Sequence, residues 1–214
     1  MSERALTGGR QWTKDIPNTT ATRDPGTGAW TVTNGWEIDT SLTPTPYYET
    51  YWDMSAYTLD DLTFFPISAV LQDGQAYSIV NTTDPLIGVI DIVSQERLDI
   101  SQVIQDHLFG NLPGQPLSTE NFEQIIMCNY RLMLPQVDFT SATLILPATT
   151  GNFGSLQPTA CEKLWIYRIA ILQGTHAATT FTSPATRFVM AGTVVKEPEL
   201  DYMMRLKRSY ELSQ

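Results

Sequence analysis

Apolar and polar residues alternate along most of this chain, and a period of two is typical of β-strands rather than helices. The alternation starts at Trp30 and Val32, stops at Asn34-Gly35, and returns in many short segments. Asn-Gly between alternating segments predicts a β-hairpin. Turn residues separate about eight or nine such segments, which favours a mainly β, antiparallel domain of the β-sandwich or jelly-roll-like type.

Three segments illustrate the expected strands. Residues 62–80 predict two strands joined at Asp73-Gly74, with Pro66 indicating an edge position or a β-bulge. The segment around residues 85–94 places Ile87, Val89 and Asp91 on one face, and Ile90 and Ile92 on the other. Residues 163–172 place Leu164, Ile166, Arg168 and Ala170 on one face, and Trp165, Tyr167, Ile169 and Ile171 on the other.

Helical spacing occurs in one or two short internal segments and at the C-terminus. Residues 98–110 place Ile100, Val103, Ile104 and Leu108 at that spacing, while 118–135 indicates helix at its start and strand at its end. Residues 196–214 predict an amphipathic helix, because acids come early and bases late, as the helix dipole favours.

The predicted organisation is an extended N-terminal arm over 1–28, a β-rich domain over 29–195, and the C-terminal helix over 196–214. The arm is polar and has one large aromatic side chain, so we expect it to be mobile or docked on a neighbouring subunit. The apolar residues of both ends are the interface candidates: Trp12, Leu200, Met203, Met204, Leu206 and Tyr210.

Charge limits the choice of partners. The 214 residues carry a net charge of −10, only 17% are charged, and 28 are threonine. Between Arg23 and Arg97 there are eleven acids and no Lys or Arg. Such a surface repels nucleic acid, so we expect no strong nucleic-acid binding. The acids indicate either a solvated face or a face for a basic partner or a cation.

Membrane insertion and secretion are not expected. The apolar runs are shorter than the ~20 residues of a membrane span, and the first residues lack the apolar region of a secretory signal. We therefore expect synthesis and folding in a cytoplasm. Cys128 and Cys161 lack the spacing of a zinc site; they are compatible with one disulfide, although buried free thiols fit their apolar surroundings better.

The sequence contains no recognisable catalytic motif. His107 and His176 lie beside no nucleophile elbow, and there is no phosphate-binding loop, HExxH motif or EF-hand loop. We predict no enzyme activity, no catalytic residue, no cofactor and no metal site. The nearest approach to a cation site is formed by carboxylates without regular ligand spacing: Asp53, Asp60, Asp61 and Asp73.

Aromatic residues offer a second hypothesis. Trp36, Tyr48, Tyr51 and Trp52 are close in sequence, and exposed aromatic rings can serve as stacking platforms for sugars. Aromatic residues also fill cores and subunit interfaces. A carbohydrate-binding β-sandwich module is therefore the alternative to a purely structural protein.

In style, the chain resembles virion structural proteins of bacteriophages and related viruses. The resemblance lies in the polar N-terminal segment, the Thr/Pro/Asn/Gly-rich short strands, the low lysine content and the terminal segment RFVMAGTVVKEPELDYMMRLKRSYEL. It implies a capsid, capsid-associated, connector or tail subunit in the virion. Such a subunit acts through contacts with its own copies, as a homo-oligomer, and with other virion proteins.

Overall fold

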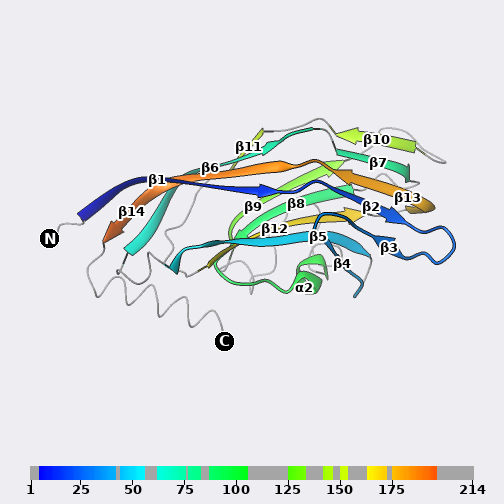
Figure 1. The fold of residues 1–214 in the computed structure, drawn as a ribbon, viewed down its shortest axis with the longest axis horizontal. Coiled ribbons are helices and arrows are strands. Elements are labelled where there is room, and N and C mark those ends of the chain that lie inside the picture. Colours follow the sequence, from blue (N-terminus) through cyan, green and yellow to red (C-terminus); the bar gives the residue numbers. More distant parts are fainter. Residues whose placement is uncertain are drawn as a thin grey trace.

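The structure is a computed structural model, and it is mostly antiparallel β-sheet (Figure 1). It describes residues 5–41, 44–55, 62–75, 77–82, 87–105, 125–133, 142–146, 150–153, 163–172 and 175–196. The mainly β, antiparallel prediction is confirmed. The short helix α2 (Ile100–Gln105) follows β8 (Ile87–Ser94). Asp99 caps the start of α2, because its carboxylate accepts a hydrogen bond from the Ser101 amide at 2.9 Å.

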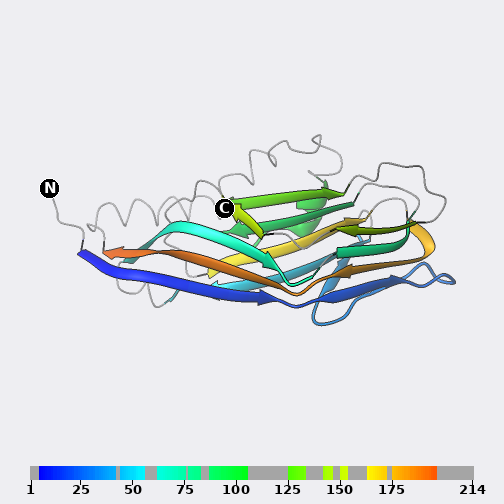
Figure 2. The same ribbon diagram turned by 90° about the horizontal axis from the view of Figure 1, so that it is seen from above.

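A first layer contains four long strand positions, each broken into two pieces at the same level. The pairs of pieces are β1 (Ala5–Ile16) with β2 (Thr19–Arg23), β14 (Thr186–Lys196) with β13 (Thr175–Ser183), β6 (Leu62–Asp73) with β7 (Tyr77–Thr82), and β11 (Thr150–Phe153) with β10 (Ala142–Leu146). The pieces form one sheet of order β1-β14-β6-β11 and another of order β10-β7-β13-β2-β3, where β3 is Trp30–Thr31. Figure 2 shows β1 running on into β2, and β13 into β14, as nearly continuous ribbons.

A second layer forms one sheet of five strands. Its order is β4 (Glu37–Asp39), β5 (Thr45–Asp53), β12 (Lys163–Leu172), β8 (Ile87–Ser94) and β9 (Ile125–Met133).

The pairing follows a simple rule when the long strand positions are numbered in chain order. Position 1 is β1–β2, 2 is β5, 3 is β6–β7, 4 is β8, 5 is β9, 6 is β10–β11, 7 is β12 and 8 is β13–β14. Position 1 then pairs with 8, 2 with 7, 3 with 6, and 4 with 5. Successive pairs alternate between the two layers. The chain therefore runs as one long antiparallel hairpin that is folded over twice.

The first layer breaks where backbone donors are missing. Pro17 separates β1 from β2 and Pro184 separates β13 from β14, and proline has no N–H to give to a ladder. Between β6 and β7, the Gly74 amide donates to the Ala185 carbonyl at 2.8 Å. The predicted turn at Asp73-Gly74 thus joins two strands, as expected, but they continue in line instead of pairing as a hairpin.

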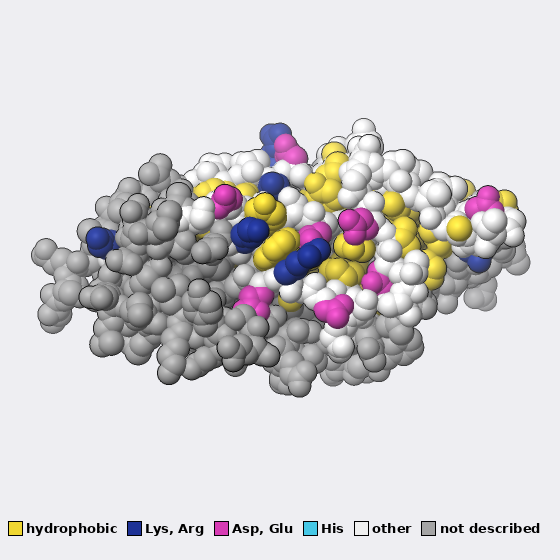
Figure 3. All heavy atoms as spheres, turned by 60° about the horizontal axis from the view of Figure 1, so that its bottom comes forward, with side chains coloured by type: hydrophobic (Ala, Val, Ile, Leu, Met, Phe, Trp, Pro, Cys, Tyr) yellow, Lys and Arg dark blue, Asp and Glu magenta, His cyan; other side chains and the backbone are white. Residues whose placement is uncertain are grey.

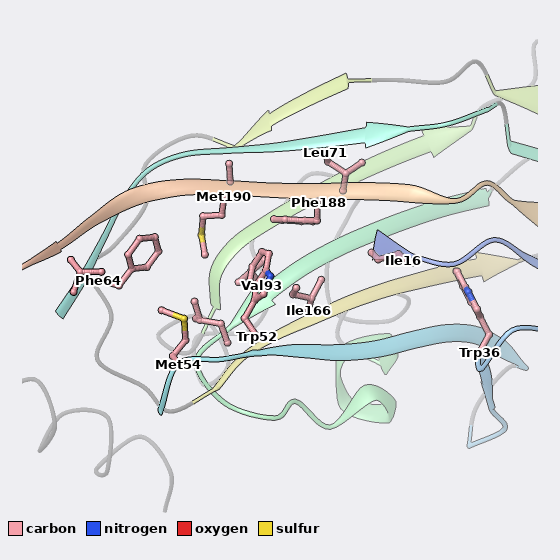
Figure 4. Packing of buried hydrophobic residues seen from close by; sticks show 13 residues of the cluster. Ile16, Trp36, Trp52, Met54, Phe64, Leu71, Val93, Ile166, Phe188 and Met190 are labelled. Carbon is pink, nitrogen blue, oxygen red and sulfur yellow. The ribbon is translucent and has the colours of Figure 1, made fainter. Parts of the chain in front are cut away.

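Two hydrophobic clusters lie between the layers, and a third lies outside them. One joins β1, β6 and β14 to β5, β8 and β12 (Figure 4), and the second joins β2, β7 and β13 to β8 and β12. The third lies on the other face of β8 and β12, where Leu98 and three residues of α2 cover it. The second layer is therefore buried on both faces along these two strands.

The predicted alternation in β8 and β12 is confirmed. Val89 and Ala170 pack toward the first layer, whereas Ile90 and Ile169 pack toward α2. Arg168 lies fully buried on the side of the first layer, at a position where the alternation predicts an inward residue. The two-residue alternation of residues 163–172 did not predict that both faces of β12 are buried.

Residues 5–23, which the sequence assigned to an arm, pair with strands of their own chain. β1 pairs with β14 along nearly its whole length, and β2 pairs with β13. Ile16 is fully buried, and the Trp12 ring meets the Phe64 ring edge-on with 4.4 Å between centroids. The expectation that this segment leaves its own domain therefore differs from the structure, because a strand needs an apolar residue only at alternate inward positions.

The predicted turn at Asn34-Gly35 and the predicted bulge at Pro66 are both present, but the turn joins different strands from those expected. Asn34 and Gly35 both have positive φ (58° and 79°), and the Trp36 amide donates to the Thr33 carbonyl at 3.3 Å, as in a type I′ turn. This turn carries the chain from β3 in the first layer to β4 in the second instead of closing a hairpin. Pro66 lies at a bulge, as predicted: Ser68 pairs with Ala191 and Pro66 with Gly192, leaving Ile67 as the extra residue.

Several other predictions have mixed outcomes. Strand β9 confirms the strand end of 118–135, whereas its helical start lies outside the described residues. β11 lies within residues 147–160, whose Gly, Asn and Pro residues predict a loop, and β13 includes His176, although the Gly, Thr and Ala residues around it also predict a loop. The predicted C-terminal helix lies outside the described residues except for Lys196, the last residue of β14.

A buried ionic network ties the layers together at the break. Arg168 Nε donates to Asp91 Oδ1 at 2.7 Å within the second layer. The guanidinium also reaches Thr186 Oγ1, and its Nη2 lies 3.4 Å from Asp73 Oδ1 across the core. Asp73 accepts from Thr186 Oγ1 at 2.7 Å and from the Tyr77 hydroxyl at 3.0 Å. Burial is the largest single effect and lowers the pKa of Arg168, but the charges of Asp91, Tyr77 and Asp73 and the hydrogen bond to Asp91 together outweigh it, so the pKa is raised.

Candidate functional site

The outer face of the first layer presents a wide, nearly uncharged set of short side chains, which we name the threonine face. Its sixteen members are Gln11, Thr13, Asp15, Thr20, Thr22, Thr31, Ser68, Val70, Gln72, Ser78, Val80, Thr180, Thr182, Arg187, Val189 and Ala191. Every member is exposed or half-buried, and Val80 keeps 36% of its surface exposed.

Strand register arranges the threonine face in five straight rows. One row contains Thr31, Thr22, Thr180 and Val80, and the next contains Thr20, Thr182 and Ser78. Beyond the break, the rows are Asp15 with Arg187 and Gln72, Thr13 with Val189 and Val70, and Gln11 with Ala191 and Ser68. Residues directly opposite on antiparallel strands point to the same side, so each row stands on one surface.

The alternating neighbours explain why this face is polar. Ala21 and Phe181 point into the core between the layers, so Thr22 and Thr180 point outward. The sequence contains this signal as two threonines spaced two residues apart in each strand, Thr20 and Thr22 in β2 and Thr180 and Thr182 in β13. The sequence does not show that these strands, which are distant along the chain, share one surface.

The threonine face carries one acid and one base, and they neutralise each other. Arg187 Nε donates to Asp15 Oδ1 at 2.9 Å across β14 and β1. That hydrogen bond and the charge of Asp15 raise the pKa of Arg187.

The outer face of the second layer differs in composition (Figure 3), because hydrophobic, basic and acidic side chains are interleaved there. Tyr51 is 39% exposed and lies beside Trp165, with 5.2 Å between ring centroids. Lys163 Nζ lies 4.6 Å from the Tyr51 centroid, and Arg97 lies over the Trp165 ring at 5.6 Å. Arg97 also pairs with Glu49 at 3.0 Å, which raises the pKa of Arg97. We name these five residues the aromatic patch.

The aromatic residues expected to form a sugar platform are mostly in the core. Trp36 and Trp52 are buried at 4% and 6% exposure, and Tyr48 packs against the first cluster. Tyr51 alone of the four is exposed. Its neighbour on the surface is Trp165, which the sequence did not place near it because 113 positions intervene along the chain.

The other residues singled out from the sequence lie in varied places. Trp12 packs inside the chain, as described above; the remaining interface candidates, Leu200, Met203, Met204, Leu206 and Tyr210, lie outside the described residues. Asp53 is exposed, and hydrogen bonds from Ser55 lower its pKa. Asp73 belongs to the buried network, and Asp60, Asp61, His107 and Cys161 lie outside the described residues.

Cys128 lies in β9 opposite Ile92. Among the residues that the structure describes, no group of three or more His, Cys, Asp or Glu side chains is arranged to hold a metal ion. No helix in the described ranges is long and apolar enough to cross a membrane.

Tyr47 and Tyr167, beside the aromatic patch, predict a loss of stability at alkaline pH. Burial raises the pKa of both phenols; the hydrogen bond from Tyr47 to Glu37 raises the first further, while the Leu98 amide, donating to Tyr167 at 2.9 Å, opposes the second. A raised pKa in the folded state stabilises the protein below the unfolded value of about 10, and that contribution is lost as pH rises above it.

We therefore expect the urea midpoint to fall as pH rises from ~8 to ~11. A tyrosine whose pKa is the same in the folded and unfolded states would cause no such fall. Tyr47→Phe removes one of the two groups and should fall less steeply over the same interval. Equal slopes for both proteins would contradict the assignment of this pH dependence to Tyr47.

Comparisons with known proteins identify no family. No family model matches the chain, and no curated protein matches it. Among solved structures, the chain is similar to an aminopeptidase from the marine sediment archaeon Thaumarchaeota archaeon, with 9% identity and a TM-score of 0.26. The alignment covers 88% of this chain and 34% of the aminopeptidase, so this chain spans about a third of that protein. A TM-score this low carries no argument about fold or function.

Proposed function

We propose that the chain is a non-enzymatic structural subunit of a virion, made in the host cytoplasm, acting through contacts with its own copies and with other virion proteins. The observation that carries the proposal is the pairing of strand positions 1 with 8, 2 with 7, 3 with 6 and 4 with 5, alternating between layers. A long hairpin folded in this way supports an eight-stranded β-sandwich of the jelly-roll type.

The step from this plan to a virion is an analogy of fold. Jelly rolls serve as viral capsid domains and as lectin domains, and a fold alone does not choose between functions. The threonine face supports a structural role, because a broad surface without net charge suits contact between subunits of a protein whose net charge is −10.

Light scattering of the purified full chain over a wide concentration range tests this function. We expect the mass to rise to a defined multiple of 23.9 kDa, and electron micrographs at the upper end to show assemblies of regular size. A chain that stays monomeric at every concentration and forms no regular assembly would remove the basis of the proposal. Truncation of residues 1–28 is not a suitable test, because β1 and β2 belong to the fold.

Carbohydrate binding is the second candidate function, and the exposed Tyr51 beside Trp165 favours it. The sugar would stack on Tyr51, and Lys163, whose Nζ lies 4.6 Å from the Tyr51 centroid, would contact its hydroxyl groups. A glycan screen followed by tryptophan fluorescence would detect binding through Trp165. We expect Tyr51→Ala to abolish a genuine signal, and an unchanged signal in that variant would exclude this site.

A further inference from the structure

The threonine face is less charged than an ordinary protein surface. Surfaces of small soluble domains carry roughly 25–35% charged residues, whereas the face carries one acid and one base that pair with each other. On the second layer, outward positions of β4, β5 and β12 include Glu37, Glu49, Asp53 and Lys163. Charge is thus concentrated on one side of the molecule and balanced on the other.

The shape of the threonine face suits another flat sheet. Twelve of its members are Thr, Ser, Val or Ala, whose side chains are short and similar in height. Rows of such side chains allow a second sheet to approach to the ~10 Å separation of packed sheets. Val70 and Val189 lie opposite each other in one row, and Val80 lies in another, so apolar side chains occur on both sides of the break.

The area of the threonine face reaches the size of a specific contact. Strands lie about 4.8 Å apart and outward residues about 6.8 Å apart along a strand, so each outward residue covers roughly 33 Å². Sixteen residues offer roughly 500 Å² per copy. Two copies would bury roughly 1,000 Å², the lower limit for a biological interface.

The charge of the threonine face indicates which partner binds there. A strongly basic or acidic partner would find no unbalanced charge here, and a phosphate group would meet only Arg187, whose Nε is bonded to Asp15. A second copy of the same face is neutral in the same way, so two copies approach there without the repulsion that their net charge of −10 imposes elsewhere.

We propose that two copies of this chain associate through their threonine faces, sheet against sheet, about a two-fold axis. The inference rests on the proposed function, since it names the partner and the surface of one subunit contact. In such an isologous contact each substitution occurs twice. A charged residue introduced on the face is therefore brought close to the same charge on the second copy.

Charge substitution tests the contact with a matched control. Val80→Lys together with Thr180→Lys adds two cations to one row of the threonine face, while Tyr51→Lys adds one to the second layer. Val80 and Tyr51 have nearly equal exposure, 36% and 39%. The measurement is sedimentation velocity of wild type and variants across concentration, with circular dichroism to confirm that each is folded.

We expect the dimer dissociation constant to rise at least ~100-fold in the Val80→Lys/Thr180→Lys protein and to change less than ~3-fold in Tyr51→Lys. Thr180→Val, which keeps the shape of the face, should retain the dimer. If the Val80→Lys/Thr180→Lys protein associates as tightly as wild type, the threonine-face contact is overturned but the structural function still stands. A wild type that is monomeric throughout overturns both.

Discussion

Arg168→Met should lower the free energy of unfolding by about 3–5 kcal/mol, the range seen when one partner of a buried ion pair is removed. Arg168 is fully buried, and its guanidinium bonds Asp91 in the second layer and reaches Asp73 and Thr186 in the first. Methionine fills much of the same volume but leaves the Asp91 carboxylate without its cation. Urea unfolding at neutral pH measures the effect.

Two further variants separate charge from packing. Arg97→Met removes an exposed arginine from its ion pair with Glu49 on the second layer, and we expect stability close to that of wild type because solvent screens that pair. Arg168→Met with Asp91→Leu replaces the buried pair by apolar groups and should recover part of the loss. A double variant that is no more stable than Arg168→Met alone would argue against the pairing of Arg168 with Asp91 as the main interaction.

Gly192→Ala should cost about 3 kcal/mol, at the upper end for overpacking of a core. A Cβ on Gly192 would overlap the Phe64 ring, whose Cζ would lie 2.6 Å away, and also the Phe65 carbonyl oxygen. Phe64 is buried in the first cluster, and the oxygen belongs to the backbone at the bulge, so neither can move aside freely. Thermal and urea unfolding both measure the change.

Gly9→Ala is the matched control for Gly192→Ala. Gly9 pairs with Thr193 on the adjacent strand, and a Cβ there would meet nothing within 4 Å. We expect stability equal to or slightly above wild type, since alanine reduces the freedom of the unfolded chain. Phe64→Leu added to Gly192→Ala relieves the ring contact alone and should restore only part of the loss. Similar stabilities for the two alanine variants would contradict the close packing at the bulge.

The sequence predicted the features that depend on neighbouring residues. Alternation in 163–172 assigned each residue of β12 to its face, because side chains on a strand point to opposite sides in turn. Asn34-Gly35 adopts the positive φ values that its residue types favour, and Pro66 lies at a bulge because proline lacks the donor that a regular ladder needs. Such signals depend on steric and hydrogen-bonding limits within a few residues.

Tertiary structure alone decided which strands pair and which surfaces they make. Trp12 and Phe64, Tyr51 and Trp165, and Arg168 and Asp73 meet across long stretches of chain, and no local period records these contacts. The threonine face has the same origin: the sequence assigned Thr22 to an N-terminal arm, and its common row with Thr180 exists only because β2 pairs with β13. Sequence sets the direction of each side chain along its own strand, whereas the surface that the side chains share depends on strand order, which the packing of the whole core determines.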